Sequence, residues 1–154
     1  MAVITMRTPQ ALLVACVLSL SGGRLAAAEP TLYDRIGGEP VLGRVVADLI
    51  DHAASDPRTG RSFHGSNLPR IKTLVTEQLC ELTGGACRYS GDSMREVHAG
   101  QRISQGEFFA FTELLQDALR RAGVGLSARN ELISRLAPME REIVERPSAG
   151  LGAP

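Results

Sequence analysis

One stretch of the sequence is Tyr89-Ser90-Gly91-Asp92-Ser93-Met94-Arg95-Glu96-Val97-His98-Ala99-Gly100. It predicts a short, partly apolar helical turn with a histidine, His98, near its end. It lies inside a longer run of weak periodicity, and long irregular segments in compact domains tend to be functional. A neutral imidazole is a good ligand for a transition metal. His98 is therefore the candidate metal ligand, although a lone histidine in a helical domain is more often a surface or packing residue.

Helical patterns lie on both sides of this stretch. A short turn over residues 31–36 is expected to stop at Gly37, and longer helices are predicted over residues 40–55, 68–83, 105–122 and 127–143. Asn67 is a good N-cap, and Ser104 with Glu107 forms a capping box. No segment shows convincing strand alternation, so the sequence predicts an all-α domain. A small helical domain with one irregular, histidine-bearing segment can fold over a flat ligand and place an imidazole on its metal.

The two ends of the chain are expected to stand apart from this domain. Residues 1–28 have the layout of a secretory signal peptide: Arg7, an apolar run and the small residues Ala26-Ala27-Ala28. Lipidation at Cys16 is a second, less favoured interpretation. The domain is expected over residues 29–146, in an exported, periplasmic setting, followed by a disordered tail over 147–154.

Charge and cysteine content narrow the possible partners. The formal net charge is +0 and no basic cluster is present, which argues against nucleic acid as a partner. The apolar run near the N-terminus is too short for a membrane span. Cys80 and Cys87 are a candidate disulfide in an exported protein, and two free thiols are the alternative.

Several motifs, in order, carry a family resemblance. They are Leu32-Tyr33-Asp34-Arg35-Ile36-Gly37-Gly38, Phe63-His64-Gly65-Ser66-Asn67, Thr83-Gly84-Gly85, Tyr89-Ser90-Gly91 and Met94-Arg95-Glu96-Val97-His98-Ala99-Gly100. Over nearly all of residues 31–144 the chain resembles a truncated haemoglobin, closest to group I. The resemblance implies a globin-like, two-over-two helical sandwich around a non-covalent haem b. It also implies His98 as the proximal iron ligand and Phe63 as an aromatic packing residue on the haem.

The distal side departs from that family pattern. Ile50 stands where the family usually carries a tyrosine, and Ile71 and Val75 take the places on the distal helix that face the iron. We therefore expect an apolar distal pocket, with Gln78 as its polar candidate. The predicted cofactor-binding set is Ile50, Phe63, Ile71, Val75, Leu79, Tyr89, Met94, His98 and Phe111.

The remaining histidines and several basic residues are candidates for further roles near the haem. His64 is either a sixth iron ligand or, as we prefer, a solvated loop residue, because loop positions are usually exposed. His52 is expected to point away from the pocket if Ile50 points into it. Arg70, Lys72 and Arg102 are possible partners for the haem propionates, and no spacing singles one out.

Three functions follow from these features. The first is reversible binding of a diatomic gas (O2, CO or NO) by haem iron. The second is a haem enzyme, either a nitric oxide dioxygenase with a redox partner or a weak peroxidase. The sequence shows no distal acid or base for cleaving peroxide, which ranks this function second. The third is a haem-free helical interaction module.

Overall fold

The computed structural model describes residues 29–145 of the 154-residue chain. The predicted leader and the predicted tail lie outside these residues. Within residues 29–145 the chain forms helices and connecting loops without a strand, which confirms the all-α prediction. In the same range, each helix is too short or too polar to cross a membrane.

The helices follow one another with short connections, except before α4. They are α1 (Leu32–Ile36), α2 (Gly38–Ser55), the 3-10 turn η1 (Gly60–Phe63), α3 (Leu68–Thr83), α4 (Met94–His98), α5 (Gln105–Arg121), α6 (Leu126–Leu136), the 3-10 turn η2 (Ala137–Met139) and α7 (Glu140–Ile143).

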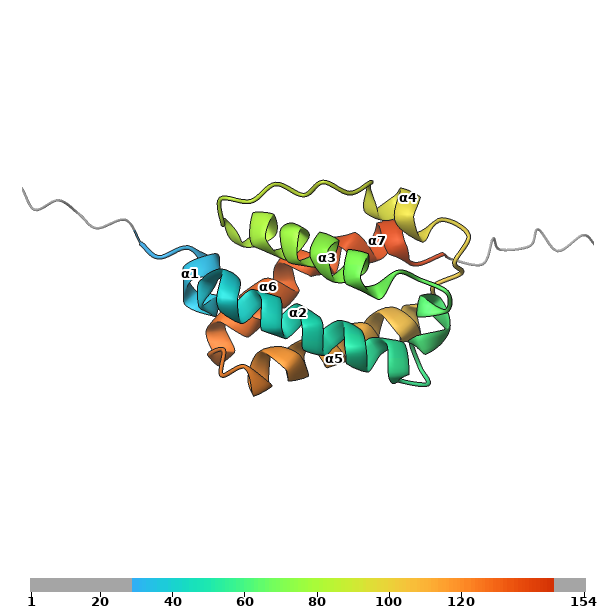
Figure 1. Cartoon of the computed structure of the whole chain (residues 1–154), viewed down its shortest axis with the longest axis horizontal. Coiled ribbons are helices and arrows are strands. Elements are labelled where there is room, and N and C mark those ends of the chain that lie inside the picture. The colour runs from blue at the N-terminus through green and yellow to red at the C-terminus, as the bar shows by residue number, and fades with distance from the viewer. Residues whose placement is uncertain (1–28, 146–154) are drawn as a thin grey trace, which may run out of the picture.

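The long helices form two layers. The central helix α2 packs against α3 on one side and against α5 on the other, and α5 packs against α6 (Figure 1). The pair α2 and α3 thus lies over the pair α5 and α6, the expected two-over-two sandwich. The short helices α4 and α7 contact each other beside α3 (Figure 1).

The core lies where α2 meets its neighbours. Apolar residues spaced three and four apart share one helix face, and on α2 this face carries Leu42, Val45, Val46 and Leu49, each 0% exposed. Leu119 of α5 and Leu132 of α6 face them and are also 0% exposed. Burying such side chains is worth about 1.5–3 kcal/mol each, which makes this contact the main source of stability.

Local signals set the ends of most helices. Asn67 caps α3 by accepting from the Arg70 N–H, and Ser104 and Glu107 cap α5 reciprocally, as predicted. Gly37 ends α1 with a φ of 111°, and a Cβ there would lie 2.5 Å from the Val41 side chain. A glycine is therefore needed where α1 turns into α2.

Two predicted helix boundaries were wrong. Helix α2 begins at Gly38, so Pro40 lies within its first turn rather than at its first position. The helix predicted over 127–143 begins at Leu126 and is interrupted by the η2 turn, which contains Pro138. Proline lacks an N–H, so the α-helical hydrogen-bond pattern is interrupted at this turn and resumes in α7.

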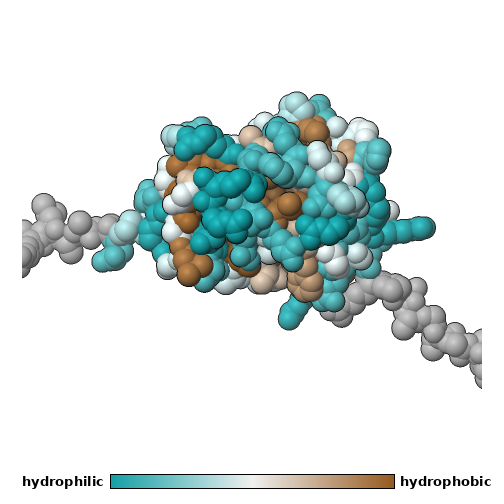
Figure 2. All heavy atoms as spheres, turned by 90° about the horizontal axis from the view of Figure 1, so that it is seen from below, coloured by the Kyte–Doolittle hydropathy of each residue, from teal (hydrophilic) through white to brown (hydrophobic). Residues whose placement is uncertain are grey.

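The outer surface is mostly polar. Figure 2 shows the face seen from below Figure 1, where hydrophilic side chains cover much of the surface and hydrophobic ones appear between them in separate patches. Phe109 and Leu126 are large hydrophobic residues that stay exposed, at 50% and 63%, and they belong to different helices. Scattered apolar residues of this kind are normal for a folded domain.

Candidate functional site

A cavity of about 320 Å³ lies between the helical layers. Small-molecule sites usually measure about 300–1,000 Å³ and are mostly apolar with a few polar groups. The cavity wall comes from α2, η1, α3, α4, α5 and the C-terminal turns, and the titratable side chains in it are Tyr89, His98 and Glu107. Its composition therefore matches a ligand-binding site.

The structure brings the whole predicted cofactor-binding set together in the wall of this one cavity. The set is Ile50, Phe63, Ile71, Val75, Leu79, Tyr89, Met94, His98 and Phe111. These residues come from separate elements and meet only in the folded chain. That they contact a cofactor stays a prediction.

His98 ends the five-residue helix α4 and is partly buried. Its Nδ1 lies 2.8 Å from the Met94 carbonyl oxygen, one helical turn earlier. A carbonyl can only accept, so Nδ1 carries the proton and Nε2 keeps its lone pair in the neutral ring. No hydrogen bond within residues 29–145 uses Nε2. Metal-bound histidines usually donate their other N–H to a carbonyl or carboxylate in this way.

The opposite wall is apolar. Ile50 of α2 is 1% exposed and Leu79 of α3 is 2% exposed, and both face the cavity beside Ile71 and Val75. None of these side chains can donate a hydrogen bond. A small molecule in this part of the cavity would therefore have apolar contacts with these four side chains and no hydrogen bond from them.

Two phenylalanines close one end of the cavity. Phe63 is the last residue of the turn η1, and Phe111 belongs to α5. Their ring centroids lie 6.5 Å apart with an interplanar angle of 19°. Such stacked pairs contribute about 0.5–1.5 kcal/mol beyond burial, so they fix η1 against α5.

Gln78 lines the cavity, but its amide points toward thioethers. Its Nε2 lies 3.0 Å from the Met94 sulfur and 3.8 Å from the Met139 sulfur. Met94 belongs to α4, so this contact joins the distal helix α3 to the histidine-bearing helix. Gln78 therefore contacts the proximal side instead of facing a guest beside Ile50.

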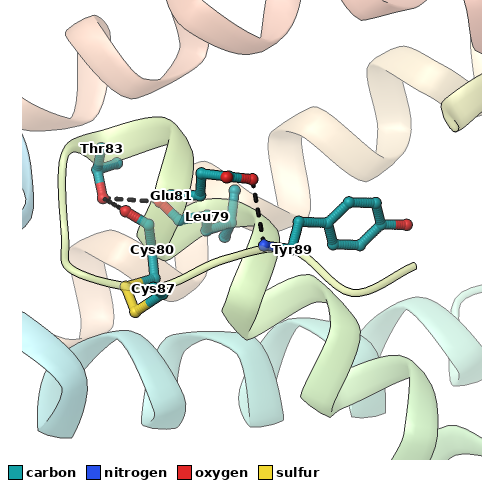
Figure 3. The surroundings of a disulfide bond; sticks show 6 residues. All are labelled: Leu79, Cys80, Glu81, Thr83, Cys87 and Tyr89. Carbon is teal, nitrogen blue, oxygen red and sulfur yellow. Dashed lines mark hydrogen bonds between the residues drawn. A yellow bond between two sulfur atoms is a disulfide. The ribbon is translucent and has the colours of Figure 1, made fainter. Parts of the chain in front are cut away.

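A disulfide ties the segment before α4 to the end of α3. Cys80 and Cys87 are joined, with their Cα atoms 5.8 Å apart. The Glu81 carboxylate accepts from the Tyr89 N–H at 3.2 Å, as Figure 3 shows. The Glu77 carboxylate accepts from the Ser90 N–H at 3.0 Å and from its hydroxyl at 2.7 Å. These bonds fix the path of the loop that leads to α4.

Tyr89 leaves this loop and lines the cavity. Its hydroxyl donates to the Asp92 carbonyl at 2.9 Å. Burial is the main cause that raises the pKa of the Tyr89 phenol, and the nearby carboxylates of Asp92 and Glu77 add to it. The side chain therefore remains neutral, with its proton committed to the backbone.

Arg61 and Glu107 form a polar contact that sequence reasoning missed. The Arg61 Nη2 donates to Glu107 Oε2 at 2.7 Å, and its Nε lies 2.6 Å from Oε1. The hydrogen bond from Arg61 is the main cause that lowers the pKa of Glu107 from 4.5 to about 2. The two residues are far apart in sequence and follow no motif, so only the folded chain shows the pair.

Met139 and Ile143 also line the cavity and were absent from the predicted set. Both lie on the apolar face of the last predicted helix, so the signal for them was present. Met139 belongs to the η2 turn and Ile143 to α7.

The other candidate residues lie outside the cavity wall. His64 and His52 are exposed and do not line the cavity, and His52 instead pairs with Asp48. Arg70, Lys72 and Arg102 also lie outside the wall, and Lys72 Nζ is 2.7 Å from Asp51. The structure therefore supports neither a sixth ligand at His64 nor a particular propionate partner.

A two-layer helical sandwich with one tautomer-fixed imidazole in an apolar cavity defines a helical cofactor-binding protein, and comparison with known proteins gives its family. The bacterial-like globin family matches residues 31–145. Group 1 truncated hemoglobin GlbN of Mycolicibacterium paratuberculosis is 35% identical over 121 residues, covering 78% of this chain and 89% of that protein.

Solved structures agree with this match. The Fe(III) form of the truncated hemoglobin from Tetrahymena pyriformis superposes with a TM-score of 0.73 at 25% identity, covering 76% of this chain and all (100%) of that one. The hemoglobin of Chloroflexus aurantiacus gives a TM-score of 0.67 at 30% identity, covering 77% and 100%. The chain belongs to the bacterial-like globin family and, within it, to the group 1 truncated haemoglobins. The cofactor of this family is haem iron.

The disulfide is expected to stabilise the fold. Replacing both cysteines (Cys80→Ser with Cys87→Ser) frees a loop with a sequence separation of 7. The chain-entropy view of cross-links gives a loss of about 2–3 kcal/mol for a loop this short. Urea unfolding of the oxidised protein and of the double variant measures this difference. Equal unfolding free energies, with the cross-link verified by mass spectrometry, would contradict the prediction.

Glu107 is expected to make stability depend on acid. Its folded pKa of about 2 lies below the unfolded value of 4.5, so the ionised carboxylate stabilises the fold above 4.5. That contribution is lost as the pH falls from 4.5 towards about 2. Glu107→Gln should lack this component, which unfolding free energies measured across this range will show. Parallel losses in the variant and the natural chain would be the contrary result.

Proposed function

We propose that this chain binds haem b through His98 and binds a diatomic gas reversibly on the apolar side of the cavity. The observation that carries the proposal is the hydrogen bond from His98 Nδ1 to the Met94 carbonyl, at 2.8 Å. It holds the imidazole in the tautomer that a metal needs, in the wall of the cavity that we assign to the cofactor. A structural histidine in a core would have both ring nitrogens satisfied.

The cavity wall suits a flat apolar group with one ligand. Met94 and Tyr89 lie on the histidine's side, and Ile71 and Val75 lie on the opposite helix. A bound haem supplies an iron with one position left for a small ligand. The residues of this chain contribute the proximal nitrogen, the apolar contact surface and the exclusion of water.

The polar groups in the wall favour gas binding over a haem enzyme. Peroxide cleavage needs a positioned acid or base that can exchange a proton. Glu107 is held ionised by Arg61, and the Tyr89 hydroxyl is bound to a backbone carbonyl. Within the described residues, no titratable side chain of α2 or α3 lines the cavity. Reversible binding needs none, so it is the function these residues support best.

Replacing the proposed ligand should release the cofactor. We expect His98→Ala to lose haem at least about ten-fold faster than the natural protein, because His98 is the only histidine that lines the cavity among residues 29–145. Haem transfer to excess apomyoglobin measures the rate. His52→Ala is the matched control, since His52 is exposed on α2 and pairs with Asp48. Equal rates for His98→Ala and the natural chain would end the assignment.

Adding a distal donor should slow dioxygen release. Dioxygen becomes polar when bound to iron, and a hydrogen bond to a charged group is worth about 1.5–3 kcal/mol, so Ile50→Tyr should lower its off-rate by about ten-fold or more. Stopped-flow displacement by carbon monoxide measures it. Ile50→Phe fills the same space without the hydroxyl and is the control. The apolar-pocket interpretation fails if the tyrosine and phenylalanine variants release dioxygen equally fast.

A further inference from the structure

Arg61 joins the two sides of the cavity. It belongs to η1, next to the cavity residues Ser62 and Phe63. Its guanidinium reaches across to the segment that follows α4: Nη1 donates to the Gln101 carbonyl at 3.0 Å and Nη2 to the Arg102 carbonyl at 2.8 Å. Neither acceptor is near Arg61 in sequence, so these contacts form only when the chain is folded.

The same guanidinium is fixed from a third direction. Glu107 Oε2 accepts from Arg61 Nη2 at 2.7 Å and from the Ser104 hydroxyl at 2.7 Å. Ser104 and Glu107 form the capping box of α5. Arg61 is therefore bonded to the start of α5 and to two consecutive carbonyls before it. A planar fork of donors matches such an arrangement, and a lysine ammonium does not.

The segment held by Arg61 is connected directly to His98. The Gln101 N–H donates to the His98 carbonyl at 3.1 Å, and the Gln101 side chain donates to the Val97 carbonyl at 2.7 Å. A shift of Gln101 would therefore move the last turn of α4, which carries the imidazole.

The backbone of this segment also needs an external hold. Arg102 has a φ of 52°, the one non-glycine residue in the left-handed region within residues 29–145. Such a conformation is costly for a side chain other than glycine and persists only when its surroundings determine it. Arg61 binds the carbonyl groups of Gln101 and Arg102, which lie directly before and after the Arg102 Cα atom.

We propose that Arg61 is a positioning residue for the iron ligand: its guanidinium clamps the segment 99–103 to η1 and α5 and thereby aligns His98 in the cavity. This role rests on the proposed haem-binding function. Arg61 does not itself line the cavity, so it acts through the backbone that follows His98.

Arg58 provides a matched control. It lies just before η1 and its side chain is 51% exposed, against 52% for Arg61. It also forms an ion pair with a glutamate of α5, Glu113, at 2.7 Å. Its partners do not include the segment 99–103. Arg58→Ala thus removes an equivalent surface charge without removing the clamp.

The experiment compares Arg61→Ala, Arg61→Lys and Arg58→Ala in the haem-loaded protein. Arg61→Ala should lose haem to apomyoglobin about ten-fold faster or more, the effect of losing several hydrogen bonds to a charged group. The iron–histidine band in the resonance Raman spectrum of the reduced protein should shift or broaden. Arg61→Lys should stay within about two-fold of Arg61→Ala, because an ammonium cannot form the fork. Arg58→Ala should keep the natural rate and band.

Each alternative result has a definite meaning. Natural haem loss and an unchanged band in Arg61→Ala overturn the clamp, as does full recovery by Arg61→Lys, which would make charge alone sufficient. Hydrogen–deuterium exchange of residues 99–104 gives a readout that needs no haem, and it should rise in both Arg61 variants and not in Arg58→Ala. If the natural chain takes up no haemin, the proposed function fails, and this exchange still decides whether the clamp exists.

Discussion

The hydrogen bond from the His98 ring to the Met94 carbonyl is the contact on which the site depends. It lies within α4, a helix of five residues. Isolated helices shorter than about 12–15 residues are marginal in water, so α4 cannot keep this geometry by itself. The Ser93–Glu96 capping box satisfies its first N–H groups. The remaining support comes from the contacts of α4 with α7 and α3 and from the chain on either side of α4.

That support comes from different chemistry at the two ends. Before α4, the Cys80–Cys87 bridge and the carboxylates of Glu77 and Glu81 fix the loop to α3. After α4, the Arg61 guanidinium fixes the chain to η1 and α5. Helix α3 and the turn η1, which contribute residues to the cavity wall, are therefore also the parts to which the chain around α4 is bonded. One connected set of bonds holds both walls of the cavity in place. A displacement of one wall should therefore also displace the other.

Features encoded by neighbouring residues could be predicted, and features made by distant ones could not. The caps at Asn67 and Ser104 depend on residues three apart, and sequence reasoning found both. The wall residues on α2 and α3 followed from the family resemblance and line one cavity. The η2 turn had a visible local cause in Pro138, which the prediction of one continuous helix did not take into account. Arg61 had no such signal, because a guanidinium that binds carbonyls some 40 residues away (separations 40 and 41) leaves no pattern in the sequence.

The placement of polar groups explains how a cavity can be both well supported and apolar where a guest binds. Buried polar atoms are costly unless they are paired. Three polar side chains of the wall pair with neighbouring residues, Tyr89 with Asp92, Gln78 with Met94 and Glu107 with Arg61, whereas the buried Ser62 hydroxyl has no partner within residues 29–145. The side chains of Ile50, Ile71, Val75 and Leu79 offer no donor, so under the proposed function a guest beside them is held by shape and by its bond to the iron. Discrimination between gases then depends on how much binding free energy each gas loses when no hydrogen-bond donor is present. Under the proposed function, a polar bound ligand loses more stabilisation without a donor than a neutral one does, so an isoleucine at position 50 is expected to favour carbon monoxide over dioxygen.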